Sequence, residues 1–258
     1  QVEKKNNKVE VLFRKAESLY ICGKLDKAQT LIEKLLETSS EHIGSLNLMG
    51  RILSALGKHD PAEITYKKVL SLEPKNIHAL FGLAETYSKT DRKIEEIALL
   101  KKVQGMNPET VIPIRHLRDT YAQQKDWKNV CIMQKKVLSL MRGNNDEKKK
   151  EQINLGQFLF ELGSRNLQAG NLDNSISNFK EALRTHEKCL PAYLSLGDAY
   201  IQSGQKKQAL KIWQTGFRQT GNKTCLIRAQ IELRDSDSYK DIMQSYEKSL
   251  ETTALEDR

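Results

Sequence analysis

The sequence predicts an all-α protein, a right-handed α-solenoid of about seven helix hairpins. Three observations support this fold class: a fixed period of 34 residues, apolar residues at helical spacing within each period, and a breaker between the two apolar runs. Small residues mark the period, because Ala16, Gly50 and Ala84 fall in register, as do Gly23 and Gly57. Each period is therefore expected to form two helices joined by a tight turn.

The second unit shows how one hairpin is encoded. Leu46 and Leu53 share a face of the first expected helix, and Gly57 ends it where a left-handed residue costs least without a Cβ. Pro61 follows an aspartate at the start of the second helix, where its fixed φ suits the first turn, and Pro74 closes that helix. Gly50 is expected where the two helices approach most closely.

The other units keep the same phase with weaker signatures. Asp91 and Glu96 replace the turn Gly and the small residue of the third unit, Arg118 and Lys125 depart from the pattern in the fourth, and Ser175 does so in the fifth. After residue 142 the phase jumps by 11 residues and then resumes. The predicted organisation is an N-terminal extension (1–8), units one to four (9–142), an inserted loop (143–153), units five and six (154–223), and a degenerate seventh unit with a C-terminal cap (224–258).

The sixth unit carries the fullest signature of the repeat. Its signature positions hold Tyr193, Leu196, Gly197, Tyr200, Gly204, Ala209, Trp213 and Phe217. A 34-residue hairpin of this kind resembles the tetratricopeptide repeat (TPR), and the resemblance implies a stacked array that needs a terminal cap. The seventh unit, with its expected turn at Asp235-Ser236-Asp237-Ser238, is predicted to be that cap.

Composition excludes several classes of protein. The chain has 258 residues, 38% hydrophobic and 29% charged, with no apolar stretch long enough to span a bilayer and no signal peptide. Its four cysteines form no CxxC pair, so we expect reduced thiols that pack as small apolar residues in a cytoplasmic protein. The first residue is Gln1 rather than Met, so we expect the chain to be a piece of a longer protein.

The charge is positive and uneven. The formal net charge is +9, and residues 1–142 hold 25 of the 42 basic but only 17 of the 33 acidic residues. Such a field could attract nucleic acid, anionic lipid or an acidic partner. The alternative is a solvated outer face, favoured by Lys-Lys pairs that recur at matching helical positions.

No motif for catalysis, cofactor binding or metal binding occurs. The sequence lacks GxGxxG, GxxxxGK[ST], HExxH and GxSxG, and its five histidines fall in different units or in turns. We therefore predict a protein that is not an enzyme and that carries neither a cofactor nor a metal.

In a stacked array of this kind, the first helices of successive units line a concave groove. The groove is predicted to hold an extended or helical protein segment, with apolar anchors for affinity and carboxylates that select basic side chains. The alternative is that these acids only solvate the helices. The central repeat position carries Glu17, Arg51, Glu85, Asp119 and Asp198, and a neighbouring position carries Phe13, Asn47, Phe81, Arg115, Phe160 and Leu194.

A narrower resemblance covers residues 9–220. The stretch Ile114–Trp127, the charged insertion after residue 142, the segment Gln157–Leu162 and the segment Leu196–Tyr200 follow the order of irregular units in the bacterial lipopolysaccharide assembly protein B family. That family is similar in carrying an N-terminal membrane helix and a C-terminal rubredoxin-like domain, neither of which is in this chain. The resemblance implies a regulator of lipopolysaccharide biosynthesis, cytoplasmic and membrane-associated through a segment beyond this chain, with inner-membrane proteins as partners.

Two other functions remain as alternatives. An RNA-binding helical repeat protein would suit the basic first half, but the strict period of 34 and the acidic groove disfavour nucleic acid. An accessory TPR domain of a larger enzyme, such as a glycosyltransferase, would carry its catalysis elsewhere. An uncapped end of the array would also let two copies associate into a homo-oligomer.

Overall fold

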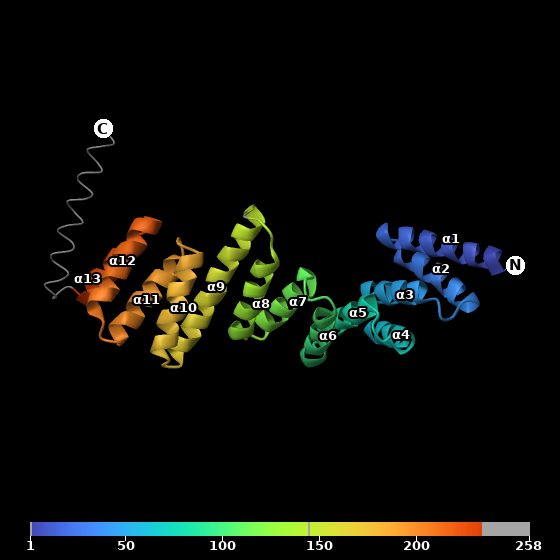
Figure 1. Cartoon of the computed structure of the whole chain (residues 1–258), viewed down its shortest axis with the longest axis horizontal. Coiled ribbons are helices and arrows are strands. Elements are labelled where there is room, and N and C mark those ends of the chain that lie inside the picture. Colours follow the sequence, from blue (N-terminus) through green and yellow to red (C-terminus); the bar gives the residue numbers. More distant parts are fainter. Residues whose placement is uncertain (1, 144, 234–258) are drawn as a thin grey trace, which may run out of the picture. The chain divides into compact units, whose positions relative to one another are not determined.

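The computed structural model describes residues 2–143 and 145–233, with side chains from residue 9 onward. Within these residues the chain forms thirteen α-helices and no strand (Figure 1). It divides into two compact units, Gln1–Thr120 and Tyr121–Arg258, and the division falls inside the seventh helix. The predicted all-α helical repeat is confirmed.

Unit 1 consists of helices that pack in sequential hairpins. Helix α1 pairs with α2, α3 with α4 and α5 with α6, and α3 also contacts α1 and α5. The elements are α1 (Val2–Ile21), α2 (Leu25–Thr38), α3 (Ile43–Ala55), α4 (His59–Leu72), α5 (Ile77–Lys89), α6 (Lys93–Met106) and the larger part of α7 (Val111–Gln123).

Unit 2 repeats the same arrangement. Helix α9 pairs with α10 and α11 with α12, while α13 packs against α12 and α11. The elements are the end of α7, then α8 (Trp127–Leu140), α9 (Asp146–Gln168), α10 (Leu172–Thr185), α11 (Leu190–Gln202), α12 (Lys206–Thr220) and α13 (Thr224–Leu233). The turn expected at 235–238 and the rest of the predicted cap lie outside the described residues.

Close contact between glycine and a bulky side chain joins the two helices of a hairpin. A Cβ added to Gly50 would lie 2.6 Å from the Tyr66 ring, and one added to Gly197 would lie 2.1 Å from Nε1 of Trp213. Both aromatic side chains are almost fully buried. The close approach predicted at Gly50 is therefore present, and it lets each hairpin bury a large ring.

The turns between paired helices share one backbone conformation. The glycines at the turn position, Gly23, Gly57, Gly170 and Gly204, have φ between 72° and 77°. At the same repeat position Asp91 has φ 59° and Lys125 has φ 56°, although both carry a Cβ. The repeat therefore imposes the left-handed turn even where its signature glycine is missing.

Helices run across two of the predicted boundaries. Residues 146–153 of the expected loop belong to α9, which begins at Asp146 after Asn145 caps it by accepting a hydrogen bond from the Lys148 N–H. These first turns of α9 are held by Glu151, which is buried. It accepts hydrogen bonds from the Gln134 side-chain amide at its backbone oxygen (2.8 Å) and at Oε2 (2.7 Å). The predicted N-terminal extension is likewise helical from Val2, as the start of α1.

Gly50→Ala should destabilise the fold by about 1–3 kcal/mol, because the new methyl group overlaps the Tyr66 ring and the well-packed hairpin must shift. Chemical denaturation followed by circular dichroism measures the change. The matched control is Gly105→Ala in α6, where nothing lies within 4 Å of the added Cβ. This control should gain about 0.5–1 kcal/mol from the lower entropy of the unfolded chain, and equal effects of the two changes would contradict the packing argument.

Lys125→Gly should stabilise the fold by about 1 kcal/mol, since glycine removes the cost of a left-handed residue that bears a Cβ. The thermal unfolding midpoint measures this effect. Gly57→Ala, the reverse change at the equivalent position, should lower the midpoint. A Lys125→Gly protein that unfolds at a lower temperature than the parent would show that the turn is not strained.

Candidate functional site

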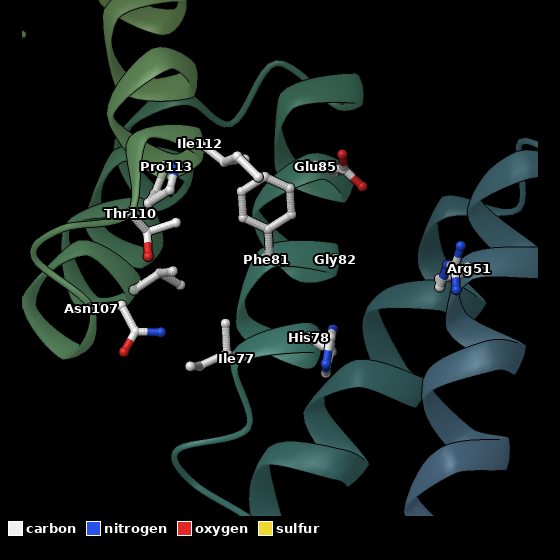
Figure 2. Close-up of a pocket in the computed structure, with 11 residues that line it drawn as sticks. Arg51, Ile77, His78, Phe81, Gly82, Glu85, Asn107, Thr110, Ile112 and Pro113 are labelled. Carbon is white, nitrogen blue, oxygen red and sulfur yellow. The ribbon is translucent and has the colours of Figure 1, made fainter. Parts of the chain in front are cut away.

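An apolar hollow of about 280 Å³ opens in unit 1. Helices α3 and α5 and the segment that joins α6 to α7 supply its walls (Figure 2). Ile77 and Phe81 project from α5, while Ile112 and Pro113 come from the start of α7. Most of the exposed surface within it is apolar, so the hollow is suited to an apolar side chain of a ligand.

The Phe81 ring is held in a fixed orientation. His116 of α7 lies edge-on to it, with the ring centroids 4.7 Å apart and the planes at 78°. The ring remains partly exposed, and the neighbouring Ile112 side chain is 59% exposed. Two large apolar groups thus face solvent side by side, which is the pattern expected where a partner supplies the missing contact.

Charged side chains flank the apolar wall. Arg51 and Glu85 line the hollow and also line a neighbouring one of about 530 Å³, which His116 and Tyr20 share. The Arg51 guanidinium lies 4.6 Å from the centroid of the Tyr20 ring, a cation–π contact. Figure 2 shows Arg51 and Phe81 on neighbouring helices, so one ligand could meet both an apolar and a charged group.

The other predicted groove residues of unit 1 are placed elsewhere. Phe13 packs edge-on against a histidine (ring centroids 5.5 Å apart), and the Asn47 amide donates to the side chain of Asn76 at 3.3 Å. Asp119 accepts a hydrogen bond from Nε of its neighbour Arg118 at 2.8 Å. Glu17 and Arg115 are half-buried and do not line the Phe81 hollow.

Unit 2 has a corresponding hollow of about 460 Å³. Phe160 lines it at the repeat position that Phe81 occupies in unit 1, together with Trp127, Phe158 and Pro191. Of the other two residues predicted in this unit, Leu194 packs on the core. The carboxylate of Asp198 accepts a hydrogen bond from Nε of Arg228 at 2.9 Å, so this acid is already neutralised.

Sequence reasoning missed the residues that close the hollows. The expected groove residues came from only two repeat positions of each first helix. They therefore did not include four residues that line the Phe81 hollow: Asn107, Thr110, Ile112 and Pro113. One signal was available for Ile112: an isoleucine at a helix start, on a face where the periodicity predicts exposure. Trp127 also lies outside those two repeat positions.

Three of the four cysteines are buried. Burial raises the pKa of the Cys131 thiol to about 12 and that of Cys225 to about 11, and it also raises the pKa of Cys189. These thiols therefore stay protonated and pack as apolar groups. Within residues 2–143 and 145–233 no cluster of His, Cys, Asp and Glu is suited to a metal ion, and none of the helices has the length and apolar character to cross a bilayer.

Comparison with known proteins identifies the repeat. Residues 43–76 and 166–223 match family models described as tetratricopeptide repeat. Superkiller protein 3 of Schizosaccharomyces pombe is 34% identical over 90 residues, which are 35% of this chain. The chain spans only 6% of the length of that relative.

Solved structures agree on the fold. A tetratricopeptide repeat protein from Parabacteroides merdae superposes with a TM-score of 0.51 at 18% identity, covering 92% of this chain and 96% of that one. The pilF protein of Pseudomonas aeruginosa gives 0.50 at 11% identity, covering 94% and 99%. The chain thus has the fold of tetratricopeptide-repeat proteins, and its residues 43–76 and 166–223 match the repeat itself. The comparisons do not confirm the narrower likeness to lipopolysaccharide assembly protein B, and they favour neither the RNA-binding nor the accessory-domain alternative.

Only Cys22, the exposed thiol, should react rapidly with an aromatic disulfide reagent, and the three buried thiols should react only on unfolding. Because burial raises their pKa in the folded state, the stability of the fold should decrease as the pH rises above about 8.5, where unfolded thiols ionise. Labelling kinetics and denaturation at increasing pH measure both effects. Cys22→Ser should remove the fast phase, and a second rapidly labelled thiol would contradict the burial of the other three.

Proposed function

We propose that this chain is a non-enzymatic interaction scaffold that binds a segment of a partner protein at the Phe81 hollow. The observation that carries the proposal is the apolar surface of Phe81 and Ile112, open to solvent beside the charged Arg51 and Glu85. The repeat fold supports it, since proteins built from this repeat bind protein or peptide segments.

Affinity would come from one apolar side chain of the partner. Burying an aliphatic or aromatic side chain against Phe81, Ile77 and Ile112 removes apolar surface from water on both sides, at about 25 cal/mol for each Å². His116 already fixes the Phe81 ring, so little ordering is needed on binding. The hollow therefore acts as the anchor of the site.

Selectivity would come from the charges at the rim. Glu85 is exposed, so it can accept hydrogen bonds from a basic side chain next to the anchor. Arg51 lies on the neighbouring helix and can pair with an acidic side chain or a carbonyl group of the same segment. The favoured ligand is a segment with an apolar residue and a nearby lysine or arginine.

The remaining predicted groove residues extend the same hypothesis. In unit 2, Phe160 would anchor a second apolar side chain in its own hollow, with Leu194 on the next first helix. Phe13, Glu17, Asn47, Arg115, Asp119 and Asp198 would have secondary roles, since contacts within the chain already engage most of them.

The resemblance to lipopolysaccharide assembly protein B gives a narrower hypothesis about the partner. In that case the bound segment would belong to an inner-membrane protease or a lipid A enzyme, and the protein would act in the cytoplasm beside the membrane. Capture of such a partner by the purified chain, lost on changing Phe81, would support this hypothesis. A homo-oligomer would be detected separately, as a concentration-dependent mass in solution.

Phe81→Ala and Glu85→Lys should each weaken binding by about ten-fold or more, because they remove the anchor and reverse the selecting charge. Peptides are first selected from a random library on the immobilised chain, and their affinities are then measured by fluorescence anisotropy. Selected peptides should pair an apolar residue with a basic one.

Two matched controls lie in the same unit. Ile94→Ala removes an apolar side chain that is 82% exposed, and Glu37→Lys reverses an exposed charge away from the hollow. Both should leave affinity unchanged. If the selected peptides bind Phe81→Ala as tightly as the parent chain, the Phe81 hollow is not the binding site.

A further inference from the structure

A fourth hollow, of about 720 Å³, lies in unit 2 between the start of α8 and the last turns of α9. We name it the cation hollow, because its lining includes Lys125, Lys128 and Arg165 around Trp127. It shares no residue with the Phe81 hollow of unit 1.

Its cations are available to a ligand. Among the residues that the structure describes, Lys125, Lys128 and Arg165 form no ion pair with a carboxylate, and all three are exposed. The nearby Asp126 is occupied, since Oδ1 accepts from the Asn129 N–H at 3.2 Å and Oδ2 from its side-chain amide at 2.7 Å. Three unpaired cations beside one engaged carboxylate leave a net positive surface.

The residue type at position 125 departs from the repeat, although the backbone does not. This lysine has φ 56°, whereas four equivalent turn positions hold glycine. Glycine adopts this left-handed conformation more readily than a residue with a Cβ. Its side chain lines the cation hollow, to which a glycine at this position would contribute no charge.

Trp127 connects the cation hollow to an apolar surface. Its ring is stacked against Phe158, with centroids 6.2 Å apart and planes at 23°. The same tryptophan lines the 460 Å³ hollow that contains Phe160 and Pro191. Positive charge and apolar surface therefore meet at one half-buried indole.

We propose that this surface docks an acidic segment of a partner protein, with its carboxylates on Lys125, Lys128 and Arg165 and an adjacent apolar side chain beyond Trp127. Charge complementarity argues for the carboxylates, and the 460 Å³ hollow for the apolar residue. A nucleic acid fits less well, because Asp126 and Glu161 border the two hollows and would repel a continuous phosphate backbone. The proposal is independent of the Phe81 hollow.

Tryptophan fluorescence tests the proposal directly. The chain has two tryptophans, and Trp213 is fully buried in the core, so a ligand-dependent change reports on Trp127. The probes are an array of short acidic peptides with one apolar residue at varied positions, the same peptides with Lys replacing each acid, single-stranded oligouridine, and inorganic phosphate.

Acidic peptides should change the fluorescence saturably and bind more weakly at high salt. The double change Lys128→Glu with Arg165→Glu should weaken this binding by about ten-fold or more. Lys207→Glu, an exposed lysine of the same unit outside the hollow, should leave it unchanged. Phe81→Ala should also leave it unchanged, which separates this proposal from the proposed function. Circular dichroism confirms that each variant is folded.

Several outcomes would overturn the proposal: no acidic peptide of the array binds, or the double variant binds as the parent does. Tighter binding of oligouridine than of every acidic peptide would assign the surface to RNA. Binding of inorganic phosphate as tight as that of the peptides would reduce it to a simple anion site.

Discussion

The structure depends on the contact between a small residue in the first helix of a hairpin and a bulky residue sixteen positions later in the second. Gly50 meets Tyr66 in this way, Gly163 meets Phe179, and Gly197 meets Trp213. Because the missing Cβ lets the two backbones approach, each hairpin buries a large ring with few voids. The contact also fixes which face of the first helix turns away from its partner. Arg51 and Phe81 reach the same hollow because α3 and α5, placed by their own hairpins, lie in contact.

Where that contact is lost, buried polar groups replace it and must find partners. In the fourth repeat the bulky position holds Gln134, which is fully buried, and its amide is satisfied by Glu151 of the next first helix. In the third repeat Glu96 is buried at a second core position, where the first, second and sixth units have alanine, and it accepts a hydrogen bond from the Thr120 hydroxyl at 2.7 Å. An unsatisfied buried carboxylate or amide would cost more than the packing it replaces. The irregular repeats therefore keep the fold through specific polar contacts that the repeat pattern does not contain.

Features that every repeat shares could be predicted from the sequence, whereas contacts specific to one repeat could not. The period of 34 located the hairpins and the turns between them, since the first six turns share a left-handed residue at one repeat position. That Asp91 and Lys125 would adopt this conformation without glycine was not predicted. The period did not predict the start of α9, which depends on one capping asparagine and one long-range contact with Gln134. At the candidate site, the two repeat positions considered in each first helix include Phe81 and Glu85. They missed Ile112 because that side chain comes from the next unit, and they could not show that Asp198 is paired with Arg228.

Specificity in such a protein has to come from positions that differ between units, because the stacking residues are interchangeable. Not all the acidic residues at the central repeat position are available to a ligand. Asp119 and Asp198 form ion pairs with arginines of the same chain, while Glu85 remains exposed beside an apolar hollow. This exposed carboxylate is the reason for proposing a basic side chain in the ligand of unit 1. In unit 2 the residues that differ from the repeat are positively charged instead. Lysine replaces glycine at the turn, and the cation hollow that it lines also contains an arginine and a tryptophan. The Phe81 hollow and the cation hollow share no lining residue, so two sites of opposite charge preference would let the protein hold a basic and an acidic segment at once.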